Sequence, residues 1–340
     1  MVYTLARMLP AIRSLPLQGI LLFGLLLSAC TSPVVLPSDS PAPTGATASP
    51  TVPTAPLQPP TRTPTPRPTP TATRTPLPTL IPTPTTTSTP EPLACWQQGG
   101  RWEESSLPSD FVPLPLEYRV YLPPCYDQLP ERRYPVLYLI HGQNFNDDQW
   151  LRLGVGETAD RLVADGQLPP FLIVLPRDRK WAQPEEDGFG KALVEELIPW
   201  IDADYRTLPG RRYRALGGLS RGASWAVHLG LSRWDLFGVL GAHSLPVFWS
   251  DTRHVRDWLQ AIPLDSLPRI FMDTGKKDYL IRSTLWFEGV LSQYGIPHEW
   301  YLYPGYHEEA YWSAHVEQYL QWYAQEWGDE DLQATPSAGD

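Results

Sequence analysis

The sequence has 340 residues, with 40 prolines, 14 tryptophans, 3 cysteines and a formal net charge of −10. Because residues 31–93 contain 19 prolines and 18 threonines, and all the tryptophans follow position 94, only residues 94–340 can build a core, which excludes two ordinary globular domains. Residues 1–93 contain five arginines and two acidic residues, so the remainder carries −13 and repels phosphate backbones, which disfavours nucleic acid as a partner.

The first 29 residues have the pattern of a secretory signal peptide. Arg7 and Arg13 precede an apolar run at 19–27, which is too short to span a bilayer comfortably. The following Leu27-Ser28-Ala29-Cys30 resembles the bacterial lipobox, in which the cysteine is acylated and becomes the mature N-terminus. We therefore expect residues 1–29 to be a lipoprotein signal peptide and Cys30 to anchor an exported protein on the extracytoplasmic face of the cell membrane. An ordinary signal peptide with an incidental cysteine is the alternative.

The Pro/Thr-rich segment predicts a spacer rather than a folded unit. Residues 30–93 are expected to form a disordered tether, and residues 329–340 a disordered acidic tail. At about 3.1 Å per residue in polyproline II conformation, the tether would reach about 190 Å at most. It would thus carry one folded domain, residues 94–328, away from the membrane.

Two cysteines remain after Cys30 is assigned to lipidation. Cys95 and Cys125 form an even pair in a chain expected to enter an oxidising compartment. They flank two strand-like runs, 100–106 and 117–122, which would pair as an antiparallel edge. The sequence therefore predicts a Cys95–Cys125 disulfide.

Strand-like and helix-length segments alternate through the rest of the domain. Apolar runs predict strands at 134–140, 171–175, 214–219, 237–242, 269–273 and 299–303. Helix candidates lie near 155–165, 188–202, 221–232, 253–261, 280–294 and 308–327. This alternation predicts an α/β fold with a mostly parallel sheet of about eight strands, an antiparallel N-terminal edge and helices on both faces. In such sheets functional residues gather at the carboxyl ends of the strands.

One strand end carries a nucleophile motif. Gly218-Leu-Ser220-Arg-Gly222 follows the run 214–219 and precedes a helix, which is the setting of a Gly-X-Ser-X-Gly nucleophile elbow. The glycines allow a sharp turn that exposes the serine Oγ. An inert helix-capping serine in a glycine-rich turn is the alternative.

A serine nucleophile needs a base and an acid that orients the base. In this fold the chain order is serine, acid and histidine. Among the seven histidines, His307 alone lies between the last predicted strand and the last predicted helix. Asp278 and Asp273 compete as the acid, and we favour Asp278 because a loop position gives it reach toward His307.

A tetrahedral oxyanion also needs preorganised donors. The backbone N–H of Arg221 at the helix start is one candidate. The second is the N–H of Gln143, in the turn that follows the strand-end dipeptide His141-Gly142.

Five stretches of sequence together resemble the esterase family of the α/β-hydrolase superfamily that includes feruloyl and acetyl-xylan esterases, esterase D and the mycolyltransferases. The resemblance covers about residues 98–327. It rests on Tyr118-Arg-Val-Tyr-Leu-Pro-Pro-Cys-Tyr126, Tyr134-Pro-Val-Leu-Tyr-Leu-Ile-His-Gly142, Gly217-Gly-Leu-Ser-Arg-Gly222, Gly275-Lys-Lys-Asp278 and Gly305-Tyr-His307. It implies an α/β-hydrolase fold, a Ser220–His307–Asp278 triad and ester cleavage without a metal or other cofactor.

The chain departs from the family pattern directly after the nucleophile. Many relatives have Ser-Met-Gly-Gly at the elbow, whereas this chain has Ser220-Arg-Gly-Ala223. The Arg221 side chain would either restrict the pocket and favour an anionic substrate, or point away into a salt bridge.

The substrate is the least determined feature. His141, Asn144, Trp150 and Trp249 follow strand ends and are candidate substrate contacts, with the aromatic rings as a sugar-stacking platform. We therefore predict a serine carboxylic-ester hydrolase acting through an acyl-enzyme on acyl or aryl esters of sugars, including polysaccharides, or of small alcohols at the cell surface. The alternatives are an acyltransferase of the mycolyltransferase type, in which an alcohol replaces water, and a non-catalytic surface binding protein.

Overall fold

An eight-stranded sheet lies at the centre of residues 94–328, the part of the chain that this computed structural model describes. The predicted signal peptide, Cys30, tether and acidic tail lie outside these residues. The strands are β1 (Arg101–Leu107), β2 (Leu116–Leu122), β3 (Val136–Ile140), β4 (Leu172–Pro176), β5 (Arg214–Leu219), β6 (Val239–His243), β7 (Arg269–Gly275) and β8 (Glu299–Tyr303). Their order is β1-β2-β4-β3-β5-β6-β7-β8.

The sheet is parallel except at its N-terminal edge. β1 pairs antiparallel with β2, and β2 pairs antiparallel with β4, whereas every later pair is parallel. The predicted α/β-hydrolase fold with an antiparallel edge is therefore confirmed. After β3 the chain adds β4 on one side of this strand and then β5 on its other side, so the strand order reverses beside β3. Open α/β sheets bind ligands at such a reversal, at the carboxyl ends of the strands.

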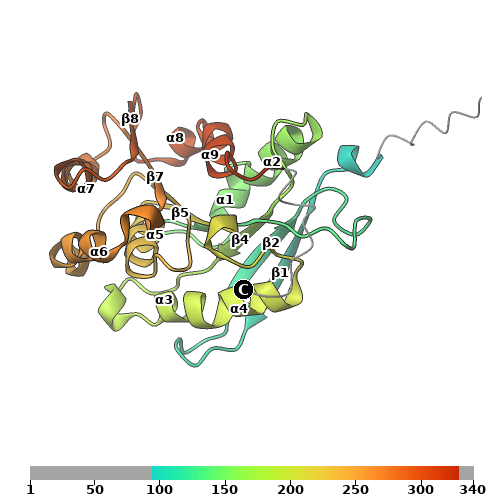
Figure 1. Cartoon of the computed structure of the whole chain (residues 1–340), viewed down its shortest axis with the longest axis horizontal. Coiled ribbons are helices and arrows are strands. Elements are labelled where there is room, and N and C mark those ends of the chain that lie inside the picture. The colour runs from blue at the N-terminus through green and yellow to red at the C-terminus, as the bar shows by residue number, and fades with distance from the viewer. Residues whose placement is uncertain (1–93, 329–340) are drawn as a thin grey trace, which may run out of the picture. The chain divides into compact units, whose positions relative to one another are not determined.

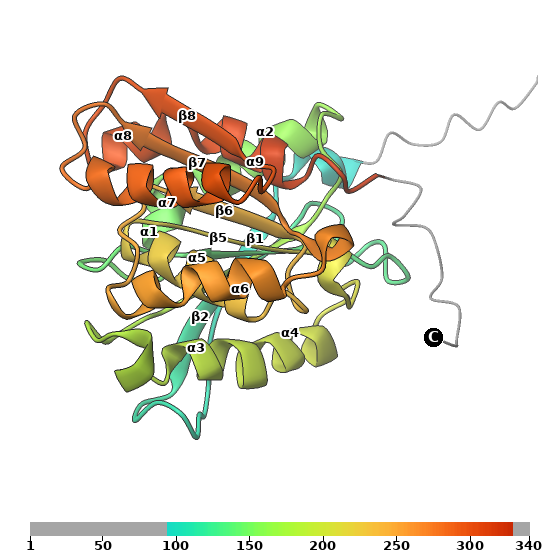
Figure 2. The ribbon, with the colours of Figure 1, turned by 60° about the vertical axis from the view of Figure 1, so that its left-hand side comes forward.

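Helices cover both faces of this sheet (Figures 1 and 2). One face carries α3 (Phe189–Lys191), α4 (Ile198–Asp204), α5 (Arg221–Ser232), α6 (Val255–Ala261) and α7 (Ile281–Gln293). The other carries α1 (Gln149–Arg152), α2 (Val155–Ala164), α8 (Glu309–Ser313) and α9 (Val316–Tyr323). Short 3₁₀ turns lie at Ala94–Gln97, Pro184–Glu186, Arg211–Tyr213, Ser250–Arg253 and Leu264–Ser266. No helix in residues 94–328 has the length and apolar composition to cross a membrane.

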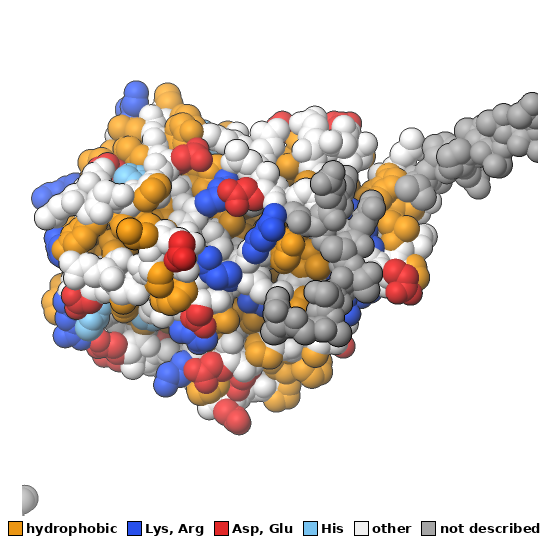
Figure 3. Space-filling view, in the orientation of Figure 1, with side chains coloured by type: hydrophobic (Ala, Val, Ile, Leu, Met, Phe, Trp, Pro, Cys, Tyr) orange, Lys and Arg blue, Asp and Glu red, His pale blue; other side chains and the backbone are white. Residues whose placement is uncertain are grey.

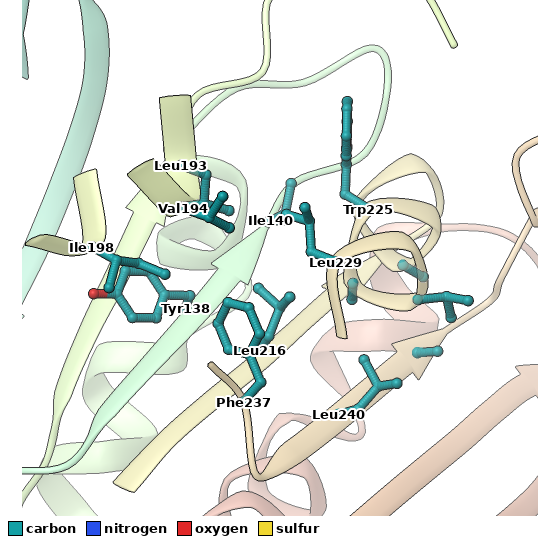
Figure 4. Close-up of a cluster of buried hydrophobic side chains, with 14 of the residues drawn as sticks. Tyr138, Ile140, Leu193, Val194, Ile198, Leu216, Trp225, Leu229, Phe237 and Leu240 are labelled. Atoms are coloured by element: carbon teal, nitrogen blue, oxygen red, sulfur yellow. The ribbon is translucent and has the colours of Figure 1, made fainter. Parts of the chain in front are cut away.

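The strands bury both faces because neighbouring side chains point to opposite sides of a pleated sheet. In β3, Tyr138 and Ile140 belong to the core under α3 to α7, and Leu137 and Leu139 belong to the opposite core. Figure 4 shows Tyr138 and Ile140 from the first of these cores, with Trp225 and Leu229 projecting from α5. Two cores thus hold the strand ends in fixed positions.

Two predicted helices are interrupted in the structure. The segment predicted as one helix near 188–202 consists of α3, a π-helical segment at Ala192–Leu197 and α4. Pro199, near the start of α4, has no N–H to donate to the preceding turn, which accounts for the break in the α-helical pattern. The segment 308–327 divides into α8 and α9 at His315, whose N–H bonds to Trp312 three residues back (3.0 Å). The short helix α1 is absent from the sequence-based prediction.

The predicted disulfide between Cys95 and Cys125 is present and joins the first described turn to the turn that follows β2. Acidic and basic side chains lie side by side on the face shown in Figure 3. This mixture agrees with ion pairs such as Arg152–Glu309 (2.8 Å) and Arg161–Glu317 (2.7 Å).

Candidate active site

Ser220 lies at the sharp turn between β5 and α5. Its φ of 52° and ψ of −125° place a non-glycine residue in a region that L-residues rarely adopt. A Cβ on Gly218 would lie 2.3 Å from the carbonyl carbon of Gly222, and a Cβ on Gly222 would lie 2.0 Å from the Ile140 oxygen. The two glycines therefore allow helix, turn and neighbouring strand to approach closely enough to fix Ser220 at the sheet edge.

The structure brings Ser220, His307 and Asp278 into one chain of hydrogen bonds. His307 Nε2 lies 2.9 Å from Ser220 Oγ, and His307 Nδ1 lies 2.9 Å from Asp278 Oδ2. The histidine follows β8 and the aspartate follows β7, so the three side chains meet at the carboxyl ends of different strands. This is the arrangement of a nucleophile, a base and an acid that orients the base.

Asp278 is held in an ionised form by its surroundings. Only 2% of the residue is exposed, and burial alone would raise its pKa. Hydrogen bonds from His307, the Leu280 N–H (2.7 Å) and Ser244 outweigh burial, so the pKa of Asp278 lies below its ordinary value. Thr274 Oγ1 donates a further bond to Oδ2 (3.0 Å). The carboxylate is therefore ionised near neutral pH.

Asp273, the competing acid, faces a different set of partners. Its carboxylate accepts hydrogen bonds from Tyr311 (2.6 Å) and Tyr319 (2.7 Å), and His243 Nδ1 lies 2.7 Å from its other oxygen. Asp273 and His243 are fully buried. These bonds direct the Asp273 carboxylate into the interior beside β6, away from His307.

The turn Gly142–Phe145, which we call the oxyanion turn after the role predicted for it, lies against Ser220. A Cβ on Gly142 would be 3.5 Å from the Ser220 Cβ, and Gln143 and Arg221 line one cleft with Ser220. Gln149 Oε1 accepts the Gly142 N–H (2.8 Å), and the Trp181 indole N–H donates to the Gln143 carbonyl (2.8 Å). Gln143 and Arg221, the two residues predicted to supply oxyanion donors, thus lie beside Ser220. The side chains of Gln149 and Trp181 hold the turn that contains Gln143.

The Arg221 side chain points away from the cleft into a double salt bridge. Its guanidinium bonds to Asp178 (2.7 Å) and Asp187 (3.1 Å), and all three residues are buried. Burial raises the pKa of Asp187, and the Phe189 N–H and the guanidinium partly offset this effect. The Arg221 side chain therefore forms the salt bridge that was one of its two predicted roles, and it does not restrict the cleft.

Two of the predicted substrate contacts are wrong. Trp150 is 1% exposed, because its indole N–H donates to the Ile140 carbonyl (3.0 Å) and its ring packs against His243. His141 is 3% exposed, burial lowers its pKa, and its Nε2 accepts the Asp178 N–H (3.0 Å), so it is a neutral support of the loop after β4. Trp249 is 80% exposed but lies outside the cleft lining, whereas Asn144 lines the cleft.

The cleft in front of Ser220 has a volume of about 620 Å³. Its walls combine apolar and aromatic side chains with a few polar groups, a composition suited to an uncharged organic acyl group. Besides Gln143, Asn144, Ser220 and Arg221, the lining consists of Gly142, Phe145, Leu219, Pro246, Tyr279, Leu280, His307, Glu308, Glu309 and Trp312.

Sequence reasoning missed the aromatic residues around His307. The Tyr279 ring centroid lies 4.8 Å from that of His307, and the Trp312 ring meets His307 edge-on at 5.0 Å. Their positions close to Asp278 and His307 in the sequence were an available signal. Within residues 94–328, no group of three or more His, Cys, Asp or Glu side chains is arranged to hold a metal ion.

Fold and site together define a serine ester hydrolase with an α/β-hydrolase fold. A family model described as "Putative esterase" matches residues 112–323, more than half of the chain. The chain belongs to this esterase family.

Named relatives agree with this assignment. The chain is 38% identical over 133 residues to an endo-1,4-beta-xylanase/feruloyl esterase of Xylanibacter ruminicola, covering 36% of this chain and 18% of the relative. It is 28% identical over 230 residues to an esterase of Mycobacterium tuberculosis, covering 52% of this chain and 49% of the relative. The chain thus spans half or less of the length of these relatives. A solved ferulic acid esterase superposes with a TM-score of 0.61 at 25% identity, covering 68% of this chain and 99% of that one.

We predict that Arg221→Ala lowers the free energy of unfolding by about 3–5 kcal/mol, because it leaves two buried carboxylates without their cation. Urea denaturation would measure the loss. Arg253→Ala is the matched control, since Arg253 pairs with Glu185 at the surface and its loss should cost under about 1 kcal/mol. Unchanged stability together with a lost preference for anionic esters would contradict the structural role.

Proposed function

We propose that Ser220, His307 and Asp278 form the catalytic triad of this esterase and that it cleaves acyl or aryl esters of sugars or small alcohols at the cell surface. The observation that carries the triad is the continuous path from Ser220 Oγ through both His307 nitrogens to Asp278, with 2.9 Å at each step. The strained backbone of Ser220 supports it, because such strain gathers at functional sites.

The proposed reaction has two halves. Ser220 Oγ attacks the ester carbonyl carbon while its proton passes to His307 Nε2. The backbone N–H groups of Arg221 and Gln143 stabilise the oxyanion, which collapses to an acyl-enzyme as the alcohol leaves with the proton from His307. Water then loses a proton to His307 and attacks the acyl carbon. The bond from that carbon to Ser220 Oγ breaks, Ser220 takes the proton back from His307, and the acid is released. Ionised Asp278 stabilises the imidazolium in both halves.

The substrate class rests on the relatives and on the cleft. Feruloyl and ferulic acid esterase names recur among the similar proteins. The cleft places Phe145 and Tyr279 beside Ser220, and aromatic side chains suit an aryl or short acyl group. Esters of sugars with such acids are therefore the proposed substrates.

We predict that a fluorophosphonate probe labels the full chain and that Ser220→Ala abolishes this labelling. The same substitution should lower kcat for p-nitrophenyl acetate at least about 10³-fold, because the acyl-enzyme can no longer form. Ser105→Ala, at an exposed position of β1, is the control and should keep both properties. Full activity of the Ser220→Ala variant would disprove the proposed nucleophile. If the unsubstituted chain formed only acylated glycerol when glycerol was added, acyl transfer would be favoured over hydrolysis.

The two candidate acids are separable by experiment. Asp278→Asn should lower kcat by about 10⁴-fold with little change in Tm, because the amide no longer holds His307 in the required tautomer. Asp273→Asn should instead lower Tm by roughly 5–10 °C and keep kcat within a few-fold, because it disturbs a buried hydrogen-bond network. Steady-state kinetics and thermal unfolding of both variants provide the comparison. The opposite pattern would make Asp273 the catalytic acid.

The surface location rests on the lipobox-like sequence that ends at Cys30. Expressed in a bacterium, the full chain should sediment with membranes and incorporate labelled palmitate. Cys30→Ala should abolish the label and release the protein to the soluble fraction, because no acyl chain then anchors it. Ser32→Ala is the control and should change neither result. Membrane association without palmitate incorporation would contradict the lipid anchor.

A further inference from the structure

We infer that a second hollow next to the catalytic cleft, which we call the Trp181 hollow, binds a neutral sugar ring in the alcohol part of the ester. It has a volume of about 280 Å³, just below the roughly 300 Å³ at which the usual range for ligand sites begins. Gln143, Asn144 and Phe145 line both this hollow and the cleft in front of Ser220. A substrate can therefore extend across the oxyanion turn from one into the other. This inference rests on the proposed function.

Trp181 is the feature that points to a sugar. The residue is 68% exposed, yet its only hydrogen-bond donor on the side chain, the indole N–H, is already used by the Gln143 carbonyl at 2.8 Å. Its ring is thus fixed by its polar edge while much of its surface faces solvent. The C–H face of a sugar ring can pack on such an indole surface, and burial of both apolar surfaces would stabilise the complex.

The loop that carries Trp181 is held before any ligand arrives. After β4, the Arg177 N–H bonds to the Glu117 carbonyl (2.9 Å) and the Asp178 N–H bonds to His141 (3.0 Å). The Lys180 N–H then bonds to the Asp178 side chain (3.0 Å). Little loop entropy would be lost on binding, which favours a preformed site.

The charges around the hollow favour a neutral sugar over a uronate. Arg177 and Arg179 line it, and both form ion pairs with Glu117. Arg177 also lies 3.9 Å from Asp147, which pairs more closely with Arg119 (2.7 Å), and Arg119 pairs in turn with Glu104. Because the three carboxylates of this network match its three guanidinium groups, the two arginines of the hollow serve as N–H donors to hydroxyl and ring oxygens rather than as an anion site.

The hollow lies within reach of a sugar in the alcohol part of an ester bound at Ser220. The order β4-β3-β5 puts the Trp181 loop two strands from the Ser220 elbow, about 10 Å at the usual strand spacing. An ester carbonyl at Ser220 can thus have its acyl group in the cleft and the sugar on its alcohol side near Trp181.

The test compares two esters with the same acyl group on the full chain, p-nitrophenyl acetate and acetylated xylotetraose. Trp181→Ala should lower kcat/KM for the oligosaccharide about tenfold more than for p-nitrophenyl acetate, mainly through KM. Trp181→Phe keeps an aromatic ring and should retain most of the preference, although it lacks the N–H. Trp200→Ala, at an exposed position of α4, is the control and should leave both rates unchanged.

An equal loss of both activities in Trp181→Ala would reduce Trp181 to a support of the oxyanion turn and overturn the inference. A binding measurement distinguishes failure of this inference from failure of the proposed function. Calorimetric titration of the full chain with xylotetraose should show binding that Trp181→Ala abolishes and Trp200→Ala keeps. Tighter binding of tri-galacturonic acid would overturn the neutral-sugar assignment. Xylotetraose binding by a chain that hydrolyses neither ester would disprove the proposed function but support the hollow.

Discussion

The close approach of α5 to the sheet at Gly218 and Gly222 is the constraint on which the site depends. A Cβ on Gly222 would lie only 2.0 Å from the Ile140 oxygen, so no side chain fits there. The start of α5 therefore lies directly against the end of β3. The Ser220 N–H bonds to the His243 carbonyl (2.9 Å), which helps to hold a strained backbone that costs about 1–3 kcal/mol. Nucleophile and oxyanion turn become neighbours as a consequence of this packing.

The strands, and the meeting of Ser220, His307 and Asp278 at one edge of the sheet, could be predicted from local signals. Apolar runs mark buried parallel strands, and glycines two positions before and after Ser220 mark the elbow. The direction of a side chain beyond a strand end has no such signal. Trp150 follows the oxyanion turn in sequence, but α1 turns its ring inward, where its N–H bonds to the Ile140 carbonyl.

The two aspartates show how environment separates chemically identical groups. Asp273 belongs to β7, and its carboxylate is saturated by donors from β6, α8 and α9, among them Tyr319, which lies 46 residues further along the chain. Asp278 lies three residues after that strand, where its carboxylate bonds to Thr274, the Leu280 N–H and His307. Long-range partners of this kind cannot be inferred from neighbouring sequence, so the sequence could favour Asp278 by its loop position but could not show that the Asp273 carboxylate already has other partners.

The loop after β4 is the element that sequence reasoning undervalued. Its Asp178 carboxylate binds the Arg221 guanidinium and the Trp225 indole N–H, both on α5, while its Trp181 indole bonds to the Gln143 carbonyl. One short loop therefore holds both α5 and the oxyanion turn in place. Arg221 departs from the family pattern at the elbow, and its side chain connects α5 to this loop. The residue next to Ser220 thus lines the cleft while its charge pairs with buried carboxylates of the scaffold.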